Sequence, residues 1–105
     1  MSDDELQNDT STLTQEKTTV EEPKLYRVLL HNDNYTTMDF VVMVLEKVFH
    51  KSPAEATRIM LNVHQKGIGV CGIYPRDIAE TKVVTVQVLA ENNNFPLLCT
   101  MEENE

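Results

Sequence analysis

The chain has 105 residues, of which 41% are apolar, and a formal net charge of −8. This length suits one small domain with a single core. The acidity belongs to the two ends, because residues 1–22 carry a net charge of −6 and residues 102–105 one of −3, while residues 23–101 carry +1. With acidic ends and no cluster of Lys or Arg, the sequence argues against binding to nucleic acid.

Cysteine usage and hydropathy indicate a cytoplasmic protein. Cys71 and Cys99 form no CxxC pair, and we expect both to be reduced and buried in the core. No apolar run reaches the ~18 residues of a membrane span, so no membrane partner is expected. The N-terminus also lacks the pattern of a secretion signal or a transit peptide.

Residues 1–23 are predicted to be a disordered acidic extension. They are rich in Thr, Ser, Asp and Glu, and they contain no aromatic residue. Such a segment buries too little apolar surface to offset the entropy of ordering it. We expect the folded domain to cover residues 24–102. The extension could serve only for solubility, or it could take part in function.

The folded part is predicted to begin with a strand over residues 24–30, which are β-branched and aromatic with partial alternation. A loop of turn-forming residues follows at 31–36. Thr36 or Thr37 can cap the next helix. That helix has an apolar stripe at helical spacing, formed by Val41, Val44, Leu45 and Val48.

A second helix is predicted to begin at the sequence Ser52-Pro53-Ala54-Glu55. Ser52 is expected to cap it, with Pro53 at the first helical position and Glu55 completing a capping box. Gly67 suits the left-handed position at the end of the helix. Because the connection to the preceding helix is very short, the two helices should pack as an antiparallel hairpin.

The secondary structure of the last third of the chain follows less directly from the sequence. Residues 68–73 are predicted to form a strand, residues 74–77 a turn and residues 95–101 a last short strand. Residues 78–91 fit a strand by their valines and a helix by their length and apolar stripe. With a helix there, the order β-α-α-β-α-β predicts an α+β domain, with three helices packed on one face of a three-stranded, mainly antiparallel sheet.

Several residues could carry chemistry, each with a plainer alternative. The loop residues Asn32, Asp33 and Asn34 could be ordinary turn formers or ligand-binding groups. His64 could be structural or functional. Met38, Met60 and Met101 could belong to the core or line an adaptable binding surface.

An enzyme or metal site is poorly supported. Cys71, His64 and Asp33 have the side chains of a thiol hydrolase, but no known cysteine signature surrounds either cysteine. His31, His50 and His64 lack the spacing of metal ligands. No nucleotide-binding or hydrolase motif is present, so we expect a non-catalytic protein without metal or cofactor.

Four stretches resemble the ClpS adaptor family, in that family's order and spacing. They are YRVLLHNDNYTTMDFV at 26–41, MLNVHQKG at 60–67, AETK at 79–82 and PLLCT at 96–100. The resemblance implies an adaptor of the N-degron pathway in the bacterial cytoplasm. Such adaptors bind proteins that begin with Leu, Phe, Tyr or Trp and pass them to the AAA+ unfoldase ClpA, which feeds the peptidase ClpP. The resemblance also implies a helix over residues 77–91.

The resemblance implies a role for individual residues as well. Asn32, Asp33 and His64 would bind the α-amino group of the substrate. The pocket for its first side chain would be lined by Asn34, Thr36, Met38, Val41, Met60, Val63 and Leu97. Glu80 and Lys82 would face the unfoldase, and the N-terminal extension would assist delivery. A binding module of similar fold that recognises a protein surface is the alternative.

Two positions depart from the pattern of the family. Asn34 stands where the family often has an aspartate, and we expect weaker long-range attraction of an ammonium group as a result. Thr37 stands where the family often has a proline, which should leave the entry to the loop slightly less rigid.

Overall fold

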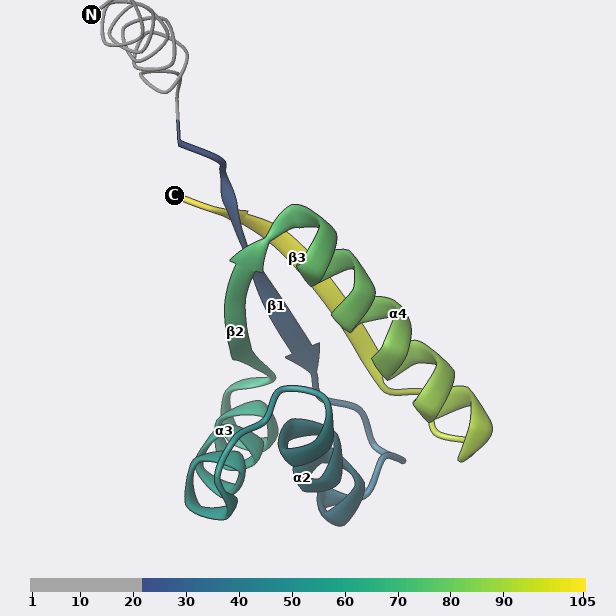
Figure 1. Ribbon diagram of the computed structural model, residues 1–105. Helices are drawn as coiled ribbons and strands as arrows, with labels where there is room; N and C mark the ends of the chain where they lie inside the picture. The colour runs from purple at the N-terminus through teal and green to yellow at the C-terminus, as the bar shows by residue number, and fades with distance from the viewer. Residues whose placement is uncertain (1–21) are drawn as a thin grey trace, which may run out of the picture.

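The computed structural model describes residues 22–105, so nearly all of the predicted extension lies outside the described residues. The elements in chain order are β1 (Leu25–His31), α2 (Met38–Lys47), α3 (Pro53–Lys66), β2 (Ile68–Pro75), α4 (Arg76–Asn92) and β3 (Leu98–Asn104). The predicted α+β order is confirmed, including the helix in the ambiguous segment (Figure 1). None of the described helices is long and apolar enough to cross a membrane.

The sheet is antiparallel, and β1 lies in its centre between β2 and β3. Val28 and Leu30 of β1 are fully buried in the core. Helix α4 packs against all three strands, and α3 packs against β2. The α2–α3 hairpin lies at the end of the sheet where β1 finishes (Figure 1), so the loop that follows β1 is held between the sheet and this hairpin.

The two hairpin helices are capped nearly as predicted. The Thr37 side chain accepts a hydrogen bond from the Phe40 amide (3.1 Å), and the Ser52 side chain accepts one from the Glu55 amide (3.2 Å). Gly67 ends α3 in the left-handed conformation with φ 88°. The predicted capping box is only half formed, because the Glu55 carboxylate accepts hydrogen bonds from Arg58 instead.

The predicted turn at residues 74–77 is wrong. Tyr74 and Pro75 continue β2, paired with Tyr26 and Leu25 of β1, and α4 starts directly at Arg76. Pro75 is tolerated because β2 is an edge strand, where a missing N–H breaks no ladder on the outer side. Strand β3 likewise begins and ends three residues later than expected.

Gly69 allows α3 to lie close to β2. A Cβ atom at this position would lie 2.7 Å from the Cγ2 atom of Val63 and 3.4 Å from the carbonyl oxygen of Ile59. Val63 is only 2% exposed and has little room to move. The close approach brings the C-terminal half of α3 against the sheet, which fixes where its side chains lie relative to the end of β1.

We expect Gly69→Ala to lower the free energy of unfolding by about 1–3 kcal/mol, because the added methyl group overpacks this contact. Denaturant unfolding would measure the change. In a Val63→Ala background the smaller side chain leaves space for the methyl group, so the additional cost of Gly69→Ala should largely disappear. Equal costs of Gly69→Ala in the two backgrounds would contradict this explanation.

Candidate functional site

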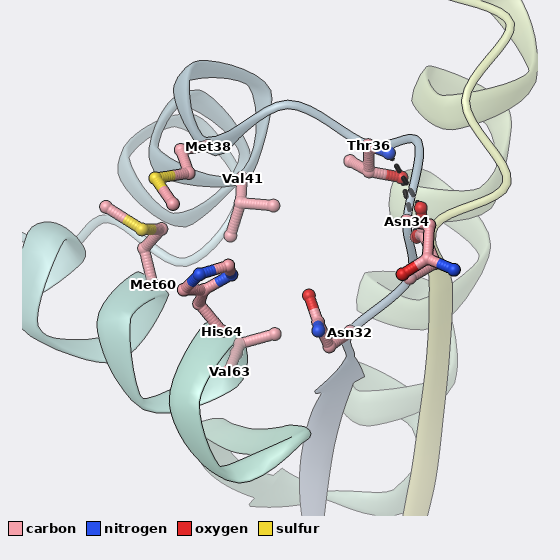
Figure 2. A pocket seen from close by; sticks show the side chains of 9 residues that line it. Asn32, Asn34, Thr36, Met38, Val41, Met60, Val63 and His64 are labelled. Carbon is pink, nitrogen blue, oxygen red and sulfur yellow. Dashed lines mark hydrogen bonds between the residues drawn. The ribbon is translucent and has the colours of Figure 1, made fainter.

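A hollow of about 240 Å³ lies between the end of β1, the loop that follows it, and the facing sides of α2 and α3. Nine of the ten residues that the sequence assigned to the amine site and the side-chain pocket line this hollow (Figure 2). They are Asn32, Asp33, Asn34, Thr36, Met38, Val41, Met60, Val63 and His64. Three segments far apart in the sequence thus meet at one place.

Asn32 and His64 are brought together by the backbone. The Asn32 amide donates to the carbonyl oxygen of Gly67 over 2.9 Å, which ties the end of β1 to the end of α3. His64 lies one helical turn before Gly67. Figure 2 shows the His64 ring and the Asn32 side chain facing one another across the hollow. Neither side chain forms a hydrogen bond with another of residues 22–105, so both remain available to a ligand.

The Asp33 carboxylate organises the loop. Its Oδ1 atom accepts hydrogen bonds from the amides of Tyr35 (2.8 Å) and Thr36 (2.6 Å), and its Oδ2 atom accepts one from the Thr36 hydroxyl (2.7 Å). A carboxylate has about four acceptor positions, so roughly one remains for a ligand. This role of Asp33 is not predicted from the sequence, although an Asp three residues before a Thr is a spacing typical of side chains that bond to nearby backbone amides.

The same hydrogen bonds keep Asp33 ionised. Partial burial alone would raise the pKa of its carboxyl group, but the bonds from the Thr36 hydroxyl and from the Thr36 and Tyr35 amides outweigh burial, and the pKa lies below its ordinary value. The hollow therefore carries a permanent negative charge at its polar end at neutral pH.

The opposite end of the hollow is apolar. Val41, Met60 and Val63 are 6%, 9% and 2% exposed, and they belong to the hydrophobic core as well as to the hollow. Met38 begins α2 and is 45% exposed, so it stands at the rim. The two methionines face each other from α2 and α3 in Figure 2. Their flexible thioethers give this end an adaptable shape.

Leu97 is not among the residues that line the hollow. It is 5% exposed and belongs to the same core cluster as Val41, Met60 and Val63. Its side chain is used to fill the core just before β3 begins. Its assignment to the pocket lining is therefore not met in this structure.

Glu80 and Lys82 line two different hollows on either side of α4. Glu80 is exposed and lines a hollow beside the first residues of β1. The Lys82 ammonium donates to the carbonyl oxygen of Val48 over 2.7 Å and lies 5.5 Å from the centre of the Tyr74 ring. Lys82 thus binds the C-terminal end of α2 to α4, and part of its role is structural.

The thiol chemistry considered from the sequence lacks support. Cys71 and Cys99 are free and buried. Burial raises the pKa of the Cys99 thiol to about 12 and moves that of Cys71 in the same direction, whereas a nucleophilic cysteine needs a lowered pKa. Among residues 22–105, no three His, Cys, Asp or Glu side chains come close enough to hold a metal ion.

The hollow is suited to a ligand that is cationic at one end and apolar at the other. Its polar end offers amide oxygens, an imidazole nitrogen and one carboxylate, which together accept hydrogen bonds from an ammonium group. Its apolar end, in the same cavity, can bury a bulky hydrocarbon side chain. The volume lies below the ~300–1,000 Å³ of sites for drug-sized ligands.

Comparison with known proteins agrees with this arrangement. Residues 21–100 match the family described as ATP-dependent Clp protease adaptor protein ClpS. The ATP-dependent Clp protease adapter protein ClpS of Syntrophus aciditrophicus is 61% identical over 84 residues, which is 80% of this chain and 78% of that protein. The protein of the same name from Myxococcus xanthus is 52% identical over 101 residues, which is 94% of each chain.

A solved structure is also similar. It is that of Agrobacterium tumefaciens ClpS2 bound to L-phenylalaninamide, with a TM-score of 0.77 and 42% sequence identity. The match covers 79% of this chain and 100% of that one. Given these matches in sequence and in fold, the chain belongs to the ClpS family, whose members are adaptors of the ATP-dependent Clp protease.

Proposed function

We propose that this chain binds the free N-terminus of proteins that begin with Leu, Phe, Tyr or Trp, and that it delivers them to the unfoldase ClpA of the ClpAP protease in the bacterial cytoplasm. The observation that carries the proposal is the single hollow with hydrogen-bond acceptors at one end and buried apolar side chains at the other. L-phenylalaninamide, the ligand of the Agrobacterium relative, carries the two complementary groups, a free amino group and an apolar side chain.

The polar end would bind the α-ammonium group. This group is a cation with three N–H donors, and Asn32, His64 and the free acceptor position of Asp33 can each receive one of them. Each charge-assisted hydrogen bond contributes about 1.5–3 kcal/mol net. An acetylated N-terminus lacks the charge and two of the donors, so Asp33 would lose its partner. That penalty gives selectivity for a free amino group.

The apolar end would bind the first side chain. Burying Leu or Phe against Val41, Met60 and Val63 is worth about 1.5–3 kcal/mol. After the entropy of association is subtracted, a dissociation constant near 1 μM, or about −8 kcal/mol, is expected. A β-branched first residue would place bulk beside Met38 at the rim, and such a difference discriminates by about 1–3 kcal/mol.

Delivery would involve α4. We place the contact with the unfoldase on this helix, at the hollow of about 410 Å³ between α4 and the end of α2, which Lys82 lines. Glu80 lines a different hollow, so a role for it would require a partner that reaches around the helix. The assignment of α4 rests on the resemblance of residues 79–82 to the family.

A peptide panel that varies only the first residue, its acetylation and its chirality tests the proposal. Calorimetric titration should show micromolar binding of peptides that begin with Leu, Phe, Tyr or Trp. Binding of peptides that begin with Ile or Val should be about fivefold to 150-fold weaker. The acetylated forms should not bind measurably. A fluorescent protein that begins with Phe should then be degraded by ClpAP faster when the chain is present. Equal binding across the panel would instead favour recognition of a protein surface.

A further inference from the structure

We propose that the Tyr35 ring packs against the second and third residues of a bound N-terminal segment, so that the site favours bulky apolar side chains at those positions. This inference rests on the proposed function. It goes beyond binding of a single terminal residue, because L-phenylalaninamide has no second residue with which Tyr35 could make contact.

Tyr35 is unusually exposed for an aromatic residue. It is 77% accessible, more than any other large apolar side chain among residues 22–105. Because little of the Tyr35 ring is removed from water on folding, it contributes little hydrophobic stabilisation to the domain. Large amphipathic rings in loops are frequent in recognition sites, because they offer contact area with few rotatable bonds.

The backbone of Tyr35 is held while its ring is free. Its amide donates to the Asp33 carboxylate over 2.8 Å, and the neighbouring Thr36 makes two further hydrogen bonds to the same carboxylate. Only the main chain of Tyr35 takes part in this arrangement. Truncating the side chain should therefore leave the loop unchanged, and a bound peptide would meet a ring whose Cα position is already fixed.

The place of Tyr35 in the loop puts it beside the path of the substrate. The residues on either side of it, Asn34 and Thr36, both line the hollow, whereas Tyr35 does not. When the first residue of a substrate occupies the hollow, the Cα atom of the second residue lies about 3.8 Å from that of the first, so the next residues leave the hollow over its rim. Tyr35 is exposed and stands between two lining residues, so its place in the chain is at that rim.

Three ligands and two variants separate this role from a general effect on the loop. The ligands are L-phenylalaninamide, a peptide that begins Phe-Leu-Leu, and a peptide that begins Phe-Gly-Gly as its matched control. In Tyr35→Ala the dissociation constant for Phe-Leu-Leu should rise about threefold to tenfold. The constants for L-phenylalaninamide and Phe-Gly-Gly should stay within about twofold of wild type. Tyr35→Phe keeps the ring and should bind all three like wild type.

Each other outcome overturns the proposal. If Tyr35→Ala binds Phe-Leu-Leu like wild type, or if all three ligands weaken by the same factor, the ring does not contact the second and third residues. Either result leaves the proposed function in place, because the wild-type chain still binds a free terminal Phe. If wild type binds none of the ligands, the proposed function fails and this inference fails with it.

Discussion

Replacing Asp33 by alanine is expected to weaken binding of a peptide that begins with Phe by about a hundredfold or more, which is roughly 2.7 kcal/mol. Alanine removes the charge opposite the ammonium group and also the three hydrogen bonds that hold Tyr35 and Thr36 in the loop. The domain should remain folded, because the carboxylate lies outside the core. Titration calorimetry and a thermal melt would measure the two effects.

Asp33→Asn separates the charge from the loop geometry. The amide oxygen can still accept from the Tyr35 and Thr36 amides, and the amide nitrogen can donate to the Thr36 hydroxyl. We expect a smaller loss of about tenfold, since only the charge is removed. Asp39→Asn, in the first turn of α2, makes the same change in net charge outside the hollow and should leave affinity unchanged. Wild-type affinity in Asp33→Ala would contradict the assignment of the polar end.

The affinity for such a peptide should fall as the pH rises above neutrality. The α-amino group of a peptide must be protonated to bind, and it loses its proton at about pH 8. The dissociation constant should therefore rise about tenfold from pH 7 to pH 9. Titration calorimetry at the two pH values would measure the change.

Asp33 does not contribute to this loss. Its pKa is lowered, so it stays ionised between pH 7 and pH 9, and its contribution is lost only when the pH falls through that lowered value. The same loss is expected in His64→Gln, which keeps a hydrogen-bond acceptor in the hollow. An affinity that does not change between pH 7 and pH 9 would contradict binding of a protonated amino group.

Local signals predicted most of the fold. Thr37, Ser52 and the left-handed Gly67 cap their helices in the structure as the sequence predicts. Such caps can be predicted because each depends only on hydrogen bonds and backbone conformation within one helical turn. The error at Tyr74 and Pro75 has the opposite cause. Turn-forming composition favoured a turn there, but pairing with the first residues of β1, some fifty positions earlier, keeps both in an extended strand.

The site could be assembled from the sequence only through the resemblance. Asn32, His64 and Met60 each had a plain structural reading, and no periodicity shows that the end of β1 meets the end of α3. That meeting depends on the hydrogen bond from the Asn32 amide to Gly67 and on the close packing at Gly69. The hydrogen bonds that occupy Asp33 were also unforeseen, because loop geometry decides which acceptors remain free.

The measurement that tests the central claim most directly compares one peptide in two forms, with a free and with an acetylated N-terminal Phe. Both forms present the same side chain to the apolar end, and only the free form presents an ammonium group to Asn32, Asp33 and His64. We predict micromolar binding of the free peptide and a loss of at least about a hundredfold on acetylation. Equal affinity of the two forms would contradict recognition of a free N-terminus by this hollow.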